Sequence, residues 1–508
     1  MADVKTDVSQ ILADLRKRAL GINDSTKPLE GFMVSFLPTG RPVHKDDYGN
    51  PWTPDLTLAE PKTDGSETKP ADGTPDPALL NQITKRQRNL GNISRLVDHK
   101  LQLNAAGQEV PGSSRISETW KVIVDGANAV PLPPINDPNL KKALDKAMKL
   151  LMKQDPDEAD NPDALIPTSA YEKYQRYRKA YNKSVQAYTA QYLAAAASPI
   201  TLQMWPVTGK TYLSDVDSAM DEWISLGKKI EIENAIDLLA AQGTDSATKM
   251  IAMAKKNYEK YQVSFGALTA TVPFVQLFPT NWCDPAKEDD GWTQYEYDST
   301  KSHSKLTSEE TSFGGSAGVN LGFFSIGASA EHSESKDHSE FSNDGLHIKF
   351  RYAIIDIERP WLNTVLLNMG NWFLNGFPKN AVSNGQINQQ KPSENEAFWL
   401  PSIPTQLIVL KDLHIKTNHS EGQFDAMRKQ TKAGGSFGWG PFTIGGHYGK
   451  SESQQTFDFS ADGEGLHVEG VQIIGWISQV LPAAPKVNAP NMPVPDKDKK
   501  KVEDGVHA

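Results

Sequence analysis

Apolar residues recur with helical spacing through the N-terminal half of the chain. Residues 1–21 carry an apolar stripe that ends at a glycine suited to stop a helix, and they predict an amphipathic N-terminal helix. Residues 22–79 are rich in Pro, Asp, Gly and Thr, so we expect an irregular segment there. The helical period returns over 80–264, with clear helices expected at 139–153 and 171–197. This part of the chain predicts a helical domain.

Past residue 264 the pattern changes to alternation. β-Branched and aromatic residues alternate with Ser, Thr and Gly, as in strands that have one buried face. The elements expected within 265–482 are strands at 347–357, 406–415 and 467–480 and one helix at 361–375. The Pro- and Lys-rich tail, 483–508, is expected to be disordered. The predicted fold class is therefore α+β, with a helical N-terminal domain followed by an antiparallel, sandwich-like β domain.

Two stretches of the β domain, 298–357 and 418–480, resemble each other. Both contain the landmarks GGS, F[ST]IG and GLH in the same order, which indicates an internal duplication. The landmarks are Gly314-Gly315-Ser316, Phe324-Ser325-Ile326-Gly327 and Gly345-Leu346-His347 in the first copy, and Gly434-Gly435-Ser436, Phe442-Thr443-Ile444-Gly445 and Gly465-Leu466-His467 in the second.

In each copy the apolar positions first have odd numbers and then even ones. A shift of one residue inverts the faces of a strand, so this change of phase predicts a turn or bulge, and each copy becomes a hairpin with one apolar face. The apolar positions are Phe313, Ala317, Val319, Leu321, Phe323, Phe324 and Ile326 in the first hairpin, and Phe437, Trp439, Phe442 and Ile444 in the second.

The opposite face and the flanks of the first hairpin are dense in Gly, Ser, Thr, Asn and His. Over 298–345 the chain resembles the insertion hairpin of aerolysin-type β-pore-forming proteins. The resemblance implies an oligomer that contributes such hairpins to a shared membrane barrel, which needs strands of about 9 to 11 residues. Two hairpins in one chain also resemble the perforin-like plan, without the signature motifs of that family. The helical first half departs from the aerolysin pattern, and Pro441 makes the second hairpin the better candidate for a packed element.

Charge and composition limit the classes of partner and the cellular environment that we expect for this protein. The net charge of −10 argues against a nucleic-acid binder, which needs a basic surface to displace counterions from phosphates. The single cysteine, Cys283, excludes an intrachain disulfide framework and offers a labelling site. The N-terminus lacks a signal-peptide pattern, so we expect a soluble, cytoplasmic protein, which would need a non-classical route for release.

Other candidate chemistry is weaker. Gly209-Lys210-Thr211 lacks the upstream glycine of a phosphate loop, and the acidic run at 155–160 lacks the central glycine of a calcium loop. His332 and His338 continue the even-numbered face of the first hairpin, so protonation near pH 6 would charge that face; the alternative is that they are solvated bystanders. No catalytic, cofactor or metal motif is present in the sequence, and we expect no enzyme activity, cofactor or metal.

The leading hypothesis is a homo-oligomer that acts on membranes through its amphipathic hairpins, in the manner of a pore-forming toxin. The first alternative is a structural or self-assembling, partner-binding protein whose hairpins pack without inserting into lipid. The second is an enzyme with an unfamiliar site.

Overall fold

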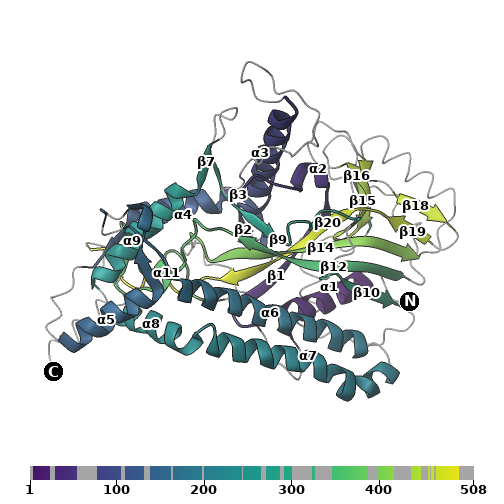
Figure 1. The fold of residues 1–508 in the computed structure, drawn as a ribbon. Coiled ribbons are helices and arrows are strands. Elements are labelled where there is room, and N and C mark those ends of the chain that lie inside the picture. The colour runs from purple at the N-terminus through teal and green to yellow at the C-terminus, as the bar shows by residue number, and fades with distance from the viewer. Residues whose placement is uncertain are drawn as a thin grey trace, which may run out of the picture.

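The computed structural model is built around one large antiparallel sheet, with helices beneath it and at one of its ends (Figure 1). It describes residues 4–22, 29–53, 77–103, 109–130, 138–158, 160–161, 164–196, 199–242, 244–264, 271–286, 291–299, 323–326, 346–386, 399–416, 436–447, 456–457, 459–462 and 465–490. The predicted α+β class is confirmed, with helices dominating the N-terminal half and strands the C-terminal half.

The large sheet has eight strands in the order β1-β20-β14-β12-β10, with β9 beside β12 and the pair β18–β19 beside β14. Its strands are β1 (Phe32–Val43), β9 (Gln276–Phe278), β10 (Thr293–Asp298), β12 (His347–Glu358), β14 (Ser402–Lys416), β18 (Phe459–Asp462), β19 (Gly465–Val468) and β20 (Val471–Val480). The three strand predictions at 347–357, 406–415 and 467–480 are thus confirmed as β12, β14 and β19–β20.

A smaller sheet has the order β11-β15-β16-β17. Its strands are β11 (Phe323–Ile326), β15 (Ser436–Trp439), β16 (Phe442–His447) and β17 (Thr456–Phe457). Four two-stranded pairs complete the strands: β2 (His99–Leu103) with β3 (Glu109–Arg115), β4 (Ala127–Ala129) with β13 (Trp372–Leu374), β5 (Met152–Gln154) with β6 (Leu165–Pro167), and β7 (Gln262–Ser264) with β8 (Thr271–Pro273).

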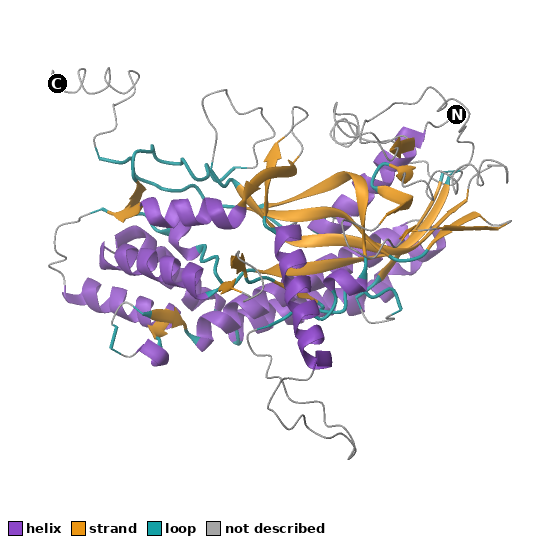
Figure 2. Ribbon diagram, turned by 90° about the horizontal axis from the view of Figure 1, so that it is seen from above, coloured by secondary structure: helices purple, strands orange, loops and turns teal. Residues whose placement is uncertain are grey.

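The helices lie along the large sheet and gather at one of its ends (Figures 1 and 2). They are α1 (Val4–Leu20), α2 (Lys45–Tyr48), α3 (Pro77–Val97), α4 (Ile116–Gly126), α5 (Pro138–Leu151), α6 (Ser169–Ala196), α7 (Pro199–Ser225), α8 (Lys229–Gln242), α9 (Thr244–Lys260) and α11 (Val365–Asn368), with a 3-10 turn at Pro156–Glu158. The helices predicted at 1–21, 139–153 and 171–197 are confirmed as α1, α5 and α6.

Both faces of the large sheet are buried, as the alternating side chains of β12 show: they point in turn into two different cores. Ile348 and Phe350 face the core that contains α1 and the hairpin β15–β16, whereas Ile355 and Ile357 face the core that contains α3. A third core joins α4, α5, α8, α9 and α11 around large aromatic side chains such as Trp361. The two sheet cores fix the face on which each covering element lies.

Helix α1 is held by both packing and charge. The Arg18 guanidinium donates to the Ala190 carbonyl of α6 at 2.9 Å and to Asp14 at 3.1 Å, and it lies 5.0 Å from the centre of the Tyr295 ring. Burial raises the pKa of the neighbouring Tyr352 hydroxyl to about 12, so that group stays neutral at ordinary pH. The N-terminal helix therefore bridges the large sheet and α6.

Three expectations from the sequence are wrong. Strand β1 lies within 22–79, which was expected to be irregular; its prolines are tolerated because β1 is an edge strand with an irregular register between Phe36 and Arg41. Residues 361–375 form only the short α11 and strand β13, because Trp372–Leu374 pairs with β4. The tail is ordered as far as residue 490, where Ala484 bridges Ser383 and is buried; residues 491–508 lie outside the described part.

Candidate functional site

The central strands β10, β12, β14 and β19 form a meander whose three connections are all long. Residues 359–401 join β12 to β14 and contain α11 and β13, whereas the other two connections hold the repeats. Residues 299–346 join β10 to β12, and residues 417–464 join β14 to β19; the two connections are equally long. Asp298 faces His347, His347 faces Lys416, and Ile415 faces Leu466 across neighbouring strands. Both connections therefore leave from the same end of the sheet, at the right of Figure 1.

The duplicated landmarks occupy related places in this arrangement. The two GLH segments lie on either side of β14, one leading into β12 and the other forming β19. The two F[ST]I segments likewise lie on either side of β15, in β11 and β16. Each copy of the repeat is thus a strand, a long connection and a returning strand.

The second predicted hairpin is present as β15–β16. Trp439 faces Phe442 across a turn formed by Gly440 and Pro441, in which Gly440 has φ of 51°. A register shift follows between Phe437 and Gly438, so the change of phase in the sequence corresponds to a turn with a bulge beside it. The hairpin geometry of the second copy is therefore confirmed.

The apolar side chains of this hairpin are buried in the core that contains α1. Phe437, Trp439, Phe442 and Ile444 are all buried there, and the Phe442 ring lies 5.6 Å from the Phe350 ring of β12. Removing such a side chain from its core costs about 1.5–3 kcal/mol, so the hairpin is held firmly in this state.

A polar contact fixes the hairpin to the large sheet. The Gln472 amide donates to the Thr443 carbonyl and accepts from the Thr443 N–H, both at 2.9 Å, and the Thr443 hydroxyl donates to the Gly40 carbonyl at 2.7 Å. Gly40 is required there, because a Cβ atom would lie 2.2 Å from the Pro441 carbonyl oxygen. Sequence reasoning missed Gln472 and Gly40, since neither belongs to a local pattern.

The first predicted hairpin is described only at β11. Phe323, Phe324 and Ile326 lie in this strand, which pairs with β15 so that Phe323 faces Trp439 and Ile326 faces Ser436. The structure thus brings the two copies together in one small sheet. The remaining predicted residues lie outside the described part of the chain: Phe313, Ala317, Val319, Leu321, His332 and His338.

The ladders of the large sheet fix where each connection would turn. All β10–β12 pairs are symmetric about the bond between Gly322 and Phe323, since Asp298 faces His347 and Thr293 faces Tyr352. The pairs of β14 with β19 are symmetric about the bond between Gly440 and Pro441. The Trp439–Phe442 and Gly438–Thr443 pairs of the observed hairpin have that same centre, and the register shift beyond them displaces the Phe437–Gly445 pair by one residue.

A row of polar side chains crosses the sheet where the connections leave. The His414 and His467 rings stack with their centres 4.0 Å apart, and His347 Nε2 lies 2.8 Å from a Glu296 carboxylate oxygen. All three histidines are partly exposed, and exposed Lys349 faces His414. The polar residues at the base of the connections therefore come from four strands, β10, β12, β14 and β19.

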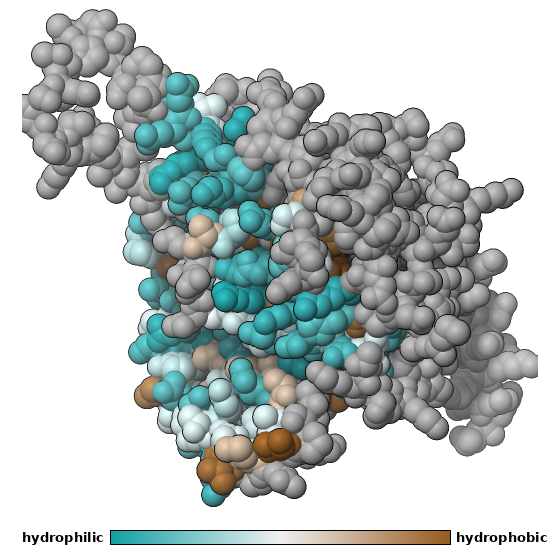
Figure 3. All heavy atoms as spheres, turned by 90° about the vertical axis from the view of Figure 1, so that its right-hand side faces the viewer, coloured by the Kyte–Doolittle hydropathy of each residue, from teal (hydrophilic) through white to brown (hydrophobic). Residues whose placement is uncertain are grey.

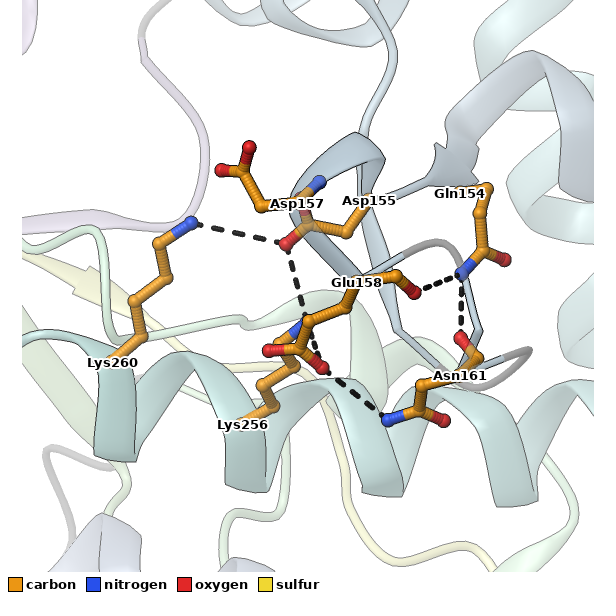
Figure 4. A network of polar contacts seen from close by, with 7 residues as sticks. All are labelled: Gln154, Asp155, Asp157, Glu158, Asn161, Lys256 and Lys260. Carbon is orange, nitrogen blue, oxygen red and sulfur yellow. Dashed lines mark hydrogen bonds and ion pairs between the residues drawn. The ribbon is translucent and has the colours of Figure 1, made fainter.

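The acidic run at 155–160 faces lysines from α9 (Figure 4). Lys256 Nζ lies 3.2 Å from Asp155 and 3.1 Å from Glu158, and Lys260 lies 3.9 Å from Asp155. The backbone N–H of Asp157 and the two lysines lower the pKa of Asp155. Among the described residues no group of three or more His, Cys, Asp or Glu is arranged to hold a metal ion.

The fold and this site together define an α+β protein whose antiparallel meander carries two equal connections at one end. Comparison with known protein families, with curated proteins and with solved structures found no match. Among the described helices, none combines the length and the apolar character that crossing a membrane requires.

Proposed function

We propose that this protein oligomerises on membranes and acts there without catalysis, by extending its two connections into the lipid as amphipathic β-hairpins that line a pore. The observation that carries the proposal is the agreement between the ladders of the sheet and the sequence of the connections. The β10–β12 ladder is centred on the Gly322–Phe323 bond, and the apolar positions of the first copy change phase one residue later, between Phe323 and Phe324.

Continuing that ladder into the first connection pairs each odd-numbered residue with an even-numbered one. Leu321 would face Phe324 and Val319 would face Ile326. Residues that face each other across a ladder lie on the same face of a hairpin, so this register gathers the apolar positions other than Phe323 on one side. Phe323 would face Gly322 at the turn itself. A shift by one residue would instead place Val319 opposite Ser325.

The lengths are also sufficient. Each connection exceeds the two strands of about 9 to 11 residues and the turn that a membrane-spanning hairpin needs. The apolar face would exchange its protein neighbours for acyl chains, which offsets the cost of leaving the core. The first connection is the better candidate for insertion, because the second is anchored by Gln472 and buried aromatic residues.

Dye release from liposomes tests the proposal. The protein should release an encapsulated dye, and Val319→Asp should abolish release because it places a charge on the lipid face, which destabilises each inserted strand. Asn320→Asp is the matched control on the opposite face and should retain release. Liposomes left intact by the parent protein from about pH 5 to 8 would exclude the proposal.

The second candidate function is assembly without lipid, and the buried packing of Phe437, Trp439 and Phe442 favours it for the second hairpin. It expects defined oligomers in plain buffer, which Val319→Asp together with Leu321→Asp would disrupt. Native mass spectrometry with and without liposomes separates the two functions, because only the first requires lipid for assembly.

A further inference from the structure

The start of α7 exposes three large apolar side chains on one helical face. Ile200, Met204 and Val207 are 72%, 56% and 75% exposed, and their spacing of four and three residues places them on one side of α7. We refer to these three residues as the apolar tip.

The apolar tip lies within a stretch that carries no charge. Residues 184–209 contain no Asp, Glu, Lys, Arg or His, although 23% of the chain is charged. The stretch covers the C-terminal half of α6, the turn and the first part of α7. An exposed helical turn on a water-facing surface ordinarily carries charged residues, so this composition indicates a different environment.

The inner side of the turn is anchored by aromatic packing. The Trp205 ring lies 5.5 Å from Tyr188, 5.6 Å from Tyr192 and 6.2 Å from Tyr212. The contacts with Tyr188 and Tyr192 join α7 to α6, the contact with Tyr212 lies within α7, and the apolar tip is left exposed. The tip is therefore presented on a packed helical hairpin.

The helical hairpin points towards the end of the sheet from which the connections leave. Lys179 of α6 pairs with Glu358 of β12, and Lys183 pairs with Asp356 at 2.8 Å. Going forward along α6 thus means going back along β12, towards His347, where the first connection ends. Figure 1 places the end of α6 and the start of α7 at the right, and Figure 3, which views that end, shows apolar surface at its lower edge.

We propose that the apolar tip is a lipid-contact site that docks this end of the protein onto a membrane surface. The inference deepens the proposed function and rests on it for the choice of a membrane as partner. Three side chains fall well short of the roughly 800 Å² per partner that a stable protein interface buries, and the uncharged surroundings offer no ion pairs to a protein. The boundary between headgroups and acyl chains accepts such a surface without specific polar partners.

Binding to phosphatidylcholine vesicles, which carry no net charge, tests the site. The triple variant Ile200→Ser, Met204→Ser and Val207→Ser should bind at least about tenfold more weakly, because each change removes apolar surface from the lipid boundary. Binding of the parent should change little with salt, since no charge takes part. Leu226→Ser with Ile230→Ser is the matched control, because these residues, just after α7 and at the start of α8, are 55% and 59% exposed, and it should bind like the parent.

A second assay separates this inference from the proposed function. A histidine-tagged triple variant on nickel-chelating lipid should regain dye release, since the tether replaces docking alone. If the parent protein binds vesicles through the apolar tip but releases no dye, the proposed pore is excluded and the proposed docking site still stands. Unchanged vesicle binding by the triple variant would overturn the docking site. A dimer that the parent forms in lipid-free buffer and the triple variant does not form would also overturn it, because the tip would then be a protein interface.

Discussion

At the scale of single residues, the one cysteine of the chain is enclosed under the large sheet. Cys283 is buried beside Trp282 in the core that contains α3, and burial raises the pKa of its thiol to about 12. The thiolate is the reactive form of cysteine, so a neutral and enclosed thiol is inert. The expectation that Cys283 offers a labelling site is therefore wrong for the folded protein.

Alkylation provides the measurement. At about pH 8, near the ordinary thiol pKa, iodoacetamide should leave the folded protein unmodified and should modify Cys283 fully once denaturant is added. Mass spectrometry of the intact chain distinguishes the two. Rapid modification of the native protein would show that this core opens readily.

A second enclosed group, Asp98, makes stability depend on pH. Its carboxylate accepts hydrogen bonds from the Ser117 N–H at 2.9 Å and from the Ser117 hydroxyl at 2.6 Å, at the start of α4. Burial nevertheless raises the pKa of Asp98 above its unfolded value. The folded state then binds more protons than the unfolded state between these two pKa values, so Asp98 lowers the free energy of unfolding as pH rises through that window.

Asp98→Asn should remove this penalty while its amide keeps both contacts with Ser117. We expect the variant to gain stability relative to the parent as pH rises from about 4 through the raised pKa, and the difference to become constant above it. Urea unfolding at several pH values measures the difference. Asp125→Asn, at the exposed end of α4, is the control and should show little trend; a trend of the opposite sign for Asp98→Asn would contradict the assignment.

At the scale of elements, the docked hairpin β15–β16 depends on the close approach at Gly40. Gly40→Val should force the hairpin away from β1, because the new side chain would overlap the Pro441 carbonyl and the Gln472 amide. Limited proteolysis should then cut within 417–464 at least about tenfold faster, since local opening exposes the backbone. Gly91→Val in α3 is the control, because a Cβ atom there meets only the Arg95 side chain at 3.8 Å. Equal cleavage of both variants would show that Gly40 does not hold the hairpin.

Local pattern predicts most of these elements, and long-range pairing explains the exceptions. Helices α1, α5 and α6 follow from their apolar stripes, and β15–β16 follows from a change of phase. Strand β1 is missed because Pro38, Gly40 and Pro42 are typical of loops, and only pairing with β20 makes the segment a strand. Likewise, the helical period near Trp361 is overridden where Trp372 pairs with Ala129 of β4.

For the candidate site, too, the sequence predicts local features but not contacts between distant strands. The apolar positions of β15–β16 are visible in the sequence, because alternation reports which face of a strand is buried. The contacts of Gln472 with Thr443 and of His414 with His467 are not, because they depend on which strands become neighbours. The apolar tip is also accessible to sequence reasoning, through the absence of charge over 184–209.

At the scale of the whole molecule, the register of the sheet makes a prediction for the membrane-bound state. If the β10–β12 ladder continues into the first connection, cysteines introduced by Val319→Cys and Ile326→Cys face each other at about 5 Å between Cα atoms and should form a disulfide on liposomes under mild oxidation. The pair Val319→Cys and Ser325→Cys, which differs by one residue, points to opposite faces and should not. Gel mobility with and without reductant reports the bond, and the reverse pattern would show another register.

The equal length of the two connections has a mechanical consequence. In the proposed inserted state, two hairpins that start from the same end of one sheet and contain the same number of residues would reach the same distance from it. Both hairpins would then reach the far leaflet of the bilayer together, and neither would end inside the bilayer while the other spanned it. A deletion that shortens one of them by a few residues would leave its tip stranded inside the bilayer, and both would have to be shortened together to restore the fit.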